Sequence, residues 1–284
     1  GDLGSQVCGR IRWDLSLPMK RLMLVTTPLA CYCTGPAPPH SQCDLREIFE
    51  QGPSLEELMY KYPTDKSKDD HKYSDLYAML FDPIRKRVLN LTEVGIAEGH
   101  SLRVWHDYFA SATIYGLDII GLEDTRRSRL KAHAVRHALA PFRRIVVDFA
   151  ANSGNSTDMA RLGLSEGSMD VVIDDAAHDL RSQERTLHAM WPLVRLGGYY
   201  VIEDTKWDAG LEPAGYPILH SPERLDAQTL QILEQNDAFF ADTLLGHRAF
   251  DMWRQRTGSY YTVDRARHNS HLVVIRKRTA LLQP

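Results

Sequence analysis

Five short apolar segments alternate with helix-like segments through the middle of the chain, and this alternation constrains the fold more than any other feature. The apolar segments are rich in β-branched residues and span residues 88–94, 113–119, 143–149, 169–175 and 199–204. Segments with helical spacing of apolar residues separate them, at 100–110, 124–139, 156–164 and 181–194. Nearly continuous apolar strands that alternate with helices are typical of a parallel sheet covered on both faces. The sequence therefore predicts an α/β fold.

The two ends of the chain follow other patterns. Residues 259–266 and 270–278 both resemble strands with no helix between them, which predicts an antiparallel C-terminal hairpin and a seven-stranded, mostly parallel sheet. Residues 1–45 lack sustained periodicity and include a Pro-rich piece, so we expect an irregular N-terminal arm. Between them, residues 46–87 predict short helices, the first with Ser54 and Glu57 in the spacing of a capping box.

The N-terminal arm carries little chemistry. Its Cys-x-Cys spacing is a weak metal signal, so we expect free or loosely paired thiols. The segment from residue 19 to 35 has the basic start and short apolar run of a signal peptide, but it is internal and too short to span a bilayer. A net charge of −3 gives no general reason to expect nucleic acid or membrane binding. We expect a cytoplasmic protein, with secretion as the alternative and homo-oligomer formation left open. The cysteines are Cys8, Cys31, Cys33 and Cys43.

Acidic residues end every one of the five predicted parallel strands. In open α/β sheets, ligands bind beyond the carboxyl ends of the strands. Like charges at one edge of a sheet repel each other, so the stability of the fold does not explain their presence. This concentration of carboxylates is the strongest functional signal in the chain. The acids are Glu93, Asp118, Asp148, Asp174, Asp175, Glu203 and Asp204.

The turn after the first strand predicts a cofactor site. Gly95 and Gly99 frame it, and Ser101 is placed to begin the following helix. The third glycine of the dinucleotide fingerprint and the lysine of a P-loop are both missing, which disfavours NAD and nucleoside triphosphates. Asp118 ends the second strand, where an acid can accept hydrogen bonds from a ribose diol, and Asp148 ends the third, beside the expected adenine. This set fits S-adenosylmethionine, which has no pyrophosphate.

The two acid pairs predict a metal site. Asp174 and Asp175 end the fourth strand, and Glu203 and Asp204 end the fifth. Three or four carboxylates in one pocket cannot all stay ionised without a cation. Oxygen ligands select a hard divalent ion, Mg²⁺ first and Mn²⁺ second. Because side chains alternate along a strand, we expect only one of Asp174 and Asp175 to bind the ion, with the alternation relaxing at the strand end.

A histidine follows the first acid pair. His178 lies three residues beyond Asp175, in the turn that opens the next helix. A histidine can accept a proton from a hydroxyl near neutral pH if a metal ion stabilises the developing alkoxide. We expect His178 to act as a general base, and we expect the other histidines to be solvated or packed. Trp105 and Tyr108, beside the glycine turn, are expected to pack in the core.

Two stretches carry a resemblance to a known family. Residues 91–119, "LTEVGIAEGHSLRVWHDYFASATIYGLDI", resemble the first motif of class I S-adenosylmethionine-dependent methyltransferases, which have a Rossmann-like fold. Within that class, this stretch and "YPTDKSKDDHKYSDLY" at 62–77 are similar to the metal-dependent sugar O-methyltransferases of macrolide and aminocoumarin antibiotic biosynthesis, the mycinamicin and novobiocin type. The likeness covers about residues 60–205, and it implies a methyltransferase domain over residues 88–284 under a helical cap from residues 46–87.

The resemblance also implies roles for single residues. It places Thr64 and Lys66 over the cofactor with Asp174 beside it, and it makes Asp175, Glu203 and Asp204 the metal ligands. It gives the position of His178 the role of base. Family members usually have Asp-Gly-Ser-His where this chain has Asp-Ala-Ala-His at residues 175–178, which affects the local turn rather than the ligands.

The implied reaction is methyl transfer from S-adenosylmethionine to a hydroxyl of a sugar or glycosylated natural product. A catechol- or phenol-type O-methyltransferase is an alternative, but it usually has a lysine near the position of His178, and none occurs between residues 171 and 180. A hydroxylase-like relative and a non-catalytic cofactor-binding relative are further alternatives. We expect the Gly- and Pro-rich stretch 206–222 to shape the acceptor pocket.

Overall fold

The computed structural model describes residues 52–123, 125–205, 225–243, 248–251 and 271–279, which belong to one compact unit, Gln51–Pro284. The predicted N-terminal arm with its cysteines, the stretch 206–222 and the predicted strand 259–266 lie outside these ranges. The division into arm, cap and methyltransferase domain therefore stays a prediction. Within the described ranges, no helix is both long and apolar enough to cross a membrane.

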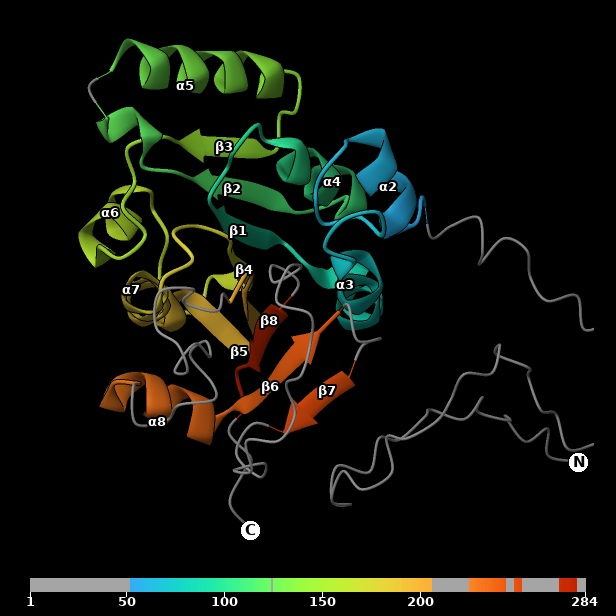
Figure 1. Ribbon diagram of the computed structural model, residues 1–284, viewed down its shortest axis with the longest axis vertical. Coiled ribbons are helices and arrows are strands. Elements are labelled where there is room, and N and C mark those ends of the chain that lie inside the picture. Colours follow the sequence, from blue (N-terminus) through green and yellow to red (C-terminus); the bar gives the residue numbers. More distant parts are fainter. Residues whose placement is uncertain (1–51, 124, 206–224, 244–247, 252–270, 280–284) are drawn as a thin grey trace, which may run out of the picture. The chain divides into compact units, whose positions relative to one another are not determined.

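A single mixed sheet with the strand order β3-β2-β1-β4-β5-β8-β6-β7 forms the centre of this unit (Figure 1). Strands β1 to β5 run parallel to one another, whereas β8 pairs antiparallel with both β5 and β6. The five predicted parallel strands and the Rossmann-like fold class are confirmed. Their bounds are β1 (Asn90–Val94), β2 (Thr113–Leu117), β3 (Ile145–Asp148), β4 (Met169–Asp174) and β5 (Val194–Ile202).

The C-terminal part of the sheet differs from the expectation. Two segments for which the sequence predicts no strand form β6 (Asp237–Asp242) and β7 (Arg248–Asp251). The described sheet therefore has eight strands rather than seven. The second predicted hairpin strand is present as β8 (His271–Arg276), and its described partners are β5 and β6.

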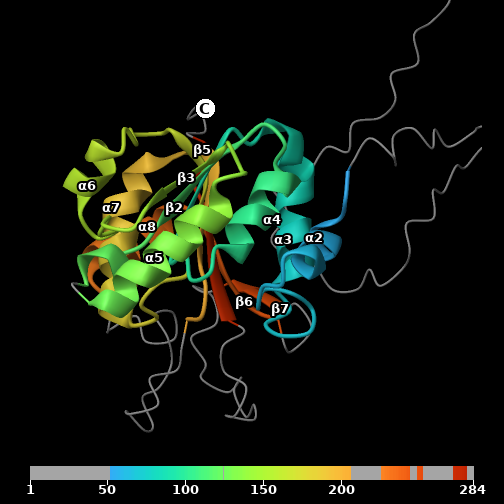
Figure 2. The same ribbon diagram turned by 90° about the horizontal axis from the view of Figure 1, so that it is seen from above.

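Helices cover the two faces of the sheet, as Figure 2 shows: α2, α3 and α4 on one side and α6, α7 and α8 on the other. Side chains along β4 point alternately to the two faces of the sheet. Val171 and Ile173 belong to the hydrophobic cluster with α2 to α5, and Val172 belongs to the cluster with α6 to α8. The helices are α2 (Leu55–Lys61), α3 (Tyr73–Phe81), α4 (His100–Tyr108), α5 (Arg126–Leu139), α6 (Ser156–Arg161), α7 (Leu180–Met190) and α8 (Ala227–Gln235), with 3₁₀ turns at Asp82–Arg87, Ile120–Leu122 and Trp191–Leu193.

Local sequence signals explain the helix ends near the site. Ser54 and Glu57 form the predicted capping box at the start of α2. Helix α3 ends just before Pro83, which lies in the following 3₁₀ turn because its ring cannot continue the α-helix.

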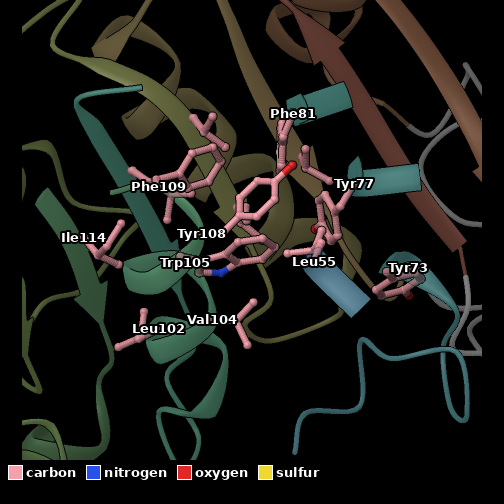
Figure 3. Packing of buried hydrophobic residues seen from close by; sticks show 14 of the residues in the cluster. Leu55, Tyr73, Tyr77, Phe81, Leu102, Val104, Trp105, Tyr108, Phe109 and Ile114 are labelled. Carbon is pink, nitrogen blue, oxygen red and sulfur yellow. The ribbon is translucent and has the colours of Figure 1, made fainter. Parts of the chain in front are cut away.

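An aromatic core fixes α3 against α4 (Figure 3). Trp105 is fully buried and makes edge contacts with the rings of Tyr77 and Phe81, at centroid distances of 5.3 and 6.2 Å. Tyr108 is buried in the same cluster. The expectation that Trp105 and Tyr108 pack in the core is confirmed, and this packing holds α3 over the carboxyl edge of the sheet.

Candidate active site at the carboxyl edge of the sheet

The ends of β4 and β5 bring the two predicted acid pairs together. Asp174 lies opposite Ile202 in the parallel register, so the residues that follow both strands emerge at the same level. The backbone N–H of Glu203 donates to the carbonyl of Asp174 at 2.9 Å, and the N–H of Asp175 donates to the carbonyl of Val94 at 2.9 Å. The sheet register thus fixes the backbone from which the acidic side chains project.

A buried lysine lies in the middle of these acids. The Nζ of Lys66 is 2.6 Å from Oδ2 of Asp175, 2.5 Å from Oε2 of Glu203 and 3.6 Å from Oε1 of Glu93. Burial alone would lower the pKa of Lys66, but the charges of Asp175, Glu203 and Glu93 outweigh it and hold the pKa well above its usual value. The acid pairs predicted neutralisation by a metal ion, and Lys66 adds a cation supplied by the chain itself.

Helix α3 contributes two hydroxyls that the sequence analysis missed. Tyr73 donates to Oδ1 of Asp204 at 2.7 Å, and Tyr77 donates to Oε1 of Glu203. The two tyrosines are four residues apart, so they lie on one face of the helix. That spacing was visible in the sequence, but its partners lie more than 120 residues away in the chain.

Three ligand-type atoms remain close together beyond these contacts. Nε2 of His178 lies 3.9 Å from Oδ1 of Asp175 and 4.0 Å from Oδ2 of Asp204. The three side chains form a candidate metal-binding group with ligand atoms within 4.8 Å of one another. Glu203, the third acid of the predicted ligand set, is not in this group, because both of its oxygens face Lys66 and Tyr77.

The charge of Lys66 does not offset the burial and mutual repulsion of the acids at this edge. Burial raises the pKa of Glu203 well above its usual value despite the attraction of Lys66, and burial also raises the pKa of Asp204. Burial, followed by repulsion from Asp175, raises the pKa of Asp174 to about 7. Burial likewise raises the pKa of Glu93 to about 7. A divalent cation would favour the ionised form of each acid, so the electrostatics fit such an ion.

Backbone strain gathers at the same place. Across the described ranges, the non-glycine residues with positive φ are Lys72, Ala97, His178 and Asp204, at 59°, 47°, 52° and 47°. Each such residue costs about 1–3 kcal/mol and persists only where the surrounding structure fixes it. Ala97 lies in the glycine turn, Lys72 precedes α3, and the other two belong to the candidate metal group.

A second histidine approaches Asp204 from the cap. Nδ1 of His71 lies 4.0 Å from Oδ1 of Asp204, and its ring stacks on Tyr73 with centroids 5.3 Å apart. His71 is thus packed, as expected for the histidines other than His178, but its approach to an acid of the site was not expected. The contact joins segments far apart in the chain and leaves no local pattern.

The predicted cofactor turn follows β1. Gly95 has φ of 89°, and a Cβ there would lie 2.0 Å from the carbonyl oxygen of Asp175, so only glycine fits. Gly99 is the N-cap of α4 with φ of 73°, and Ser101 is buried in the first helical turn, where it hydrogen-bonds Glu93. The structure thus brings the glycine turn into contact with the residue that begins the metal group.

The remaining predicted cofactor residues have partners within the chain. Asp118 accepts the N–H groups of Ile96 at 3.1 Å and Ile120 at 2.9 Å, which ties the glycine turn to the loop after β2. Asp148, at the end of β3, accepts the N–H of Ala150 and pairs with Arg161 at 2.8 Å.

Two further predicted cofactor residues flank the carboxylates, and their partners are also within the chain. Thr64 lies two residues before Lys66, and its hydroxyl donates to Asp65 at 3.3 Å. Asp174 accepts from the hydroxyl of Tyr200 at 3.4 Å. Their roles toward a cofactor stay predictions.

Comparison with known proteins supports the resemblance. No model of a known protein family matches the chain. The chain is similar to L-olivosyl-oleandolide 3-O-methyltransferase of Streptomyces antibioticus, with 29% identity over 168 residues that cover 57% of this chain and 39% of the relative. It is also similar to demethylmacrocin O-methyltransferase of Streptomyces fradiae, with 35% identity over 164 residues that cover 55% of this chain and 37% of the relative. The chain thus spans under two fifths of the length of these curated relatives.

A solved structure shows the same fold. The MycE methyltransferase from the mycinamycin biosynthetic pathway, in complex with Mg, SAH and mycinamycin VI, matches with a TM-score of 0.54 and 23% identity. The match covers 82% of this chain and 57% of that one. The class I methyltransferase fold and the resemblance to sugar O-methyltransferases of antibiotic biosynthesis are therefore confirmed.

Proposed function

We propose that the chain is an S-adenosylmethionine-dependent, divalent-metal-dependent O-methyltransferase that acts on a sugar hydroxyl of a glycosylated natural product. The observation that carries the proposal is the convergence of Asp175, Asp204 and His178 beside the Gly95 turn. A cofactor turn, a hard-cation site and a base at one sheet edge together supply what metal-assisted methyl transfer to a hydroxyl needs.

The residues around the first three strands suit S-adenosylmethionine. Gly95 and Gly99 allow the backbone to approach a ligand closely, and Asp118 and Asp148 lie at successive strand ends, where we expect the ribose and the adenine of the cofactor. Glu93 keeps Oε1 without a hydrogen-bond partner in the described part of the chain, although the atom is buried. A buried acceptor of this kind costs free energy until a donor reaches it, which fits a site that a ligand completes.

The carboxylates suit Mg²⁺ or Mn²⁺, with Asp175 and Asp204 as direct ligands and Glu203 as the third residue that the resemblance implies. Hard divalent ions prefer oxygen ligands, and such an ion would stabilise the ionised form of Glu203 and Asp204, whose pKa values burial raises. When bound, such an ion lowers the pKa of an acceptor hydroxyl.

His178 is the proposed general base. Its Nε2 faces the free oxygens of both aspartates, so a hydroxyl held there lies within reach of the imidazole. Removal of the hydroxyl proton by His178 yields the nucleophile that attacks the methyl group of the cofactor. Nδ1 of His178 is buried and has no hydrogen-bond partner among the described residues.

The acceptor class rests on the relatives. The name of the first relative contains an olivosyl-oleandolide, and the MycE complex contains mycinamycin VI. From these two we propose a glycosylated acceptor for this chain.

We expect the reaction to take place in the cytoplasm.

The test is incubation of the purified chain with labelled S-adenosylmethionine, Mg²⁺ and a panel of glycosylated macrolides, free sugars, nucleotide sugars and phenols. We expect label in a glycosylated acceptor, complete loss of transfer in EDTA, and recovery with Mg²⁺ or Mn²⁺. The His178→Ala variant is the matched control, since it should bind the cofactor without transferring its methyl group. Full activity in chelator would remove the metal from the proposal, and label in phenols alone would favour the catechol-type alternative.

A further inference from the structure

Lys66 bridges acids that come from two different strands. Its ammonium group lies 2.6 Å from Asp175 after β4 and 2.5 Å from Glu203 after β5. Lys66 is 1% exposed, and Glu93 is a third carboxylate at 3.6 Å. An ammonium group has three N–H donors, and two of these donate to Asp175 and Glu203, while the carboxylate of Glu93 lies just beyond hydrogen-bond distance.

The cap contacts select which carboxylate oxygens stay available. Lys66 engages Oδ2 of Asp175, and Tyr73 engages Oδ1 of Asp204. The other oxygen of each aspartate, Oδ1 of Asp175 and Oδ2 of Asp204, lies about 4 Å from Nε2 of His178. Each aspartate is therefore held by one oxygen and presents the second toward the same point.

We propose that Lys66 is a positioning residue of the metal site, and that it does not contact the cofactor as the family resemblance implies. It holds the carboxylates of Asp175 and Glu203 against each other, so that the free oxygen of Asp175 points toward Asp204 and His178. Without this bridge, two like charges in a buried site would separate and Asp175 would lose its fixed orientation. This inference rests on the proposed function, because it assumes that the site binds a divalent ion.

The test is Mn²⁺ affinity, measured from the six-line electron paramagnetic resonance signal of free Mn²⁺, in Lys66→Met and in the wild-type chain. We expect Mn²⁺ binding to weaken by about 10–100-fold, the range for loss of a group that orients a metal ligand. Affinity for S-adenosylhomocysteine, measured by calorimetry, should stay within about twofold. The matched control is Lys68→Met in the same turn, since Lys68 pairs with exposed Asp75 at 2.9 Å and should change neither affinity.

Circular dichroism melting must show that the variant folds. If Lys66→Met does not fold, Lys66→Gln keeps hydrogen-bond donors at this position without the charge and takes its place in the same titrations. Loss of S-adenosylhomocysteine binding by about tenfold or more would overturn the proposal and restore Lys66 as a cofactor contact. Equal or tighter Mn²⁺ binding would overturn it as well. A wild-type chain that binds no Mn²⁺ would refute the metal in the proposed function itself, which is a separate outcome.

Discussion

Replacement of Asp174 by asparagine should stabilise the chain in a pH-dependent way. Asp174 is 1% exposed, and burial followed by repulsion from Asp175 raises its pKa from 3.8 to about 7. The hydrogen bonds from Ala176 and Tyr200 favour the ionised form but do not compensate. Folding therefore favours the protonated carboxyl group, which asparagine resembles in shape and charge.

The sign and size of the effect follow from linkage. A carboxyl group whose pKa is higher in the folded than in the unfolded chain stabilises the fold below the unfolded pKa, and this contribution is lost as pH rises through the folded pKa. A rise from 3.8 to about 7 is about three pKa units, or roughly 4 kcal/mol. The Asp174→Asn variant has no carboxyl group at this position, so its stability does not fall as the pH rises through about 7. Its stability relative to wild type should therefore grow from near zero at about pH 4 to roughly 4 kcal/mol above about pH 7.5.

The assay is urea unfolding of both chains from about pH 5 to 9 in EDTA, which keeps divalent ions from compensating the charge. Asparagine offers one acceptor oxygen and an amide donor, as the protonated carboxyl group offers one acceptor and one donor, so Ala176 and Tyr200 meet the same kinds of groups in the variant as in protonated wild type. Asp179→Asn is the control. Asp179 caps α7, and hydrogen bonds from Ser182 outweigh its desolvation and lower its pKa. It therefore stays ionised in the folded and the unfolded chain from about pH 5 to 9, and the stability difference between Asp179→Asn and wild type should not change with pH. A flat difference for Asp174→Asn would refute the reasoning.

Three further predictions concern the proposed chemistry. His178→Ala should lower turnover by about 10²–10⁴-fold, with Mg²⁺ affinity by calorimetry unchanged; near-normal turnover would contradict its role as base. Gly95→Ala should abolish S-adenosylhomocysteine binding in calorimetry and lower the stability by at least about 1–3 kcal/mol in melting experiments. The reason is that φ is 89° and the new Cβ would lie 2.0 Å from the Asp175 carbonyl oxygen, so binding as in wild type would argue against a tight cofactor turn. Mg²⁺ affinity should rise with pH, because burial raises the pKa of Asp204 and protons compete for its oxygens; pH-independent calorimetric affinities would exclude Asp204 as a ligand.

Much of the fold and part of the site were predictable because they follow from local periodicity. A strand of mostly apolar residues, such as 169–174, can be recognised from its composition. Parallel strands then place their carboxyl ends along one edge of the sheet. That rule alone brings Asp175 and Asp204 together, although they are separated by a whole helix and strand. The glycine turn was predictable for a similar reason, since Gly95 and Gly99 lie between a strand and a helix.

The contacts made by the cap were not predictable, because they join segments without a shared local pattern. Lys66 is 109 residues from Asp175 and 137 residues from Glu203, and nothing near Lys66 in the sequence indicates that it is buried among acids. A lysine is usually exposed, and only the family resemblance implied a role for Lys66, as a cofactor contact. β6 was missed because it pairs at the far side of β8, and its partners on that strand lie between 29 and 39 residues later in the chain.

The geometry at Asp204 shows how a strand end becomes a ligand site. Side chains of neighbouring strand residues point to opposite faces, so Glu203 and Asp204 should diverge. In the structure they instead contact Tyr77 and Tyr73, one turn apart on the same helix. The left-handed backbone of Asp204, with φ of 47°, breaks the alternation at this residue. Aspartate is among the few residues enriched in that conformation, so the same side chain supplies both the carboxylate and the tolerance for the strained turn that orients it.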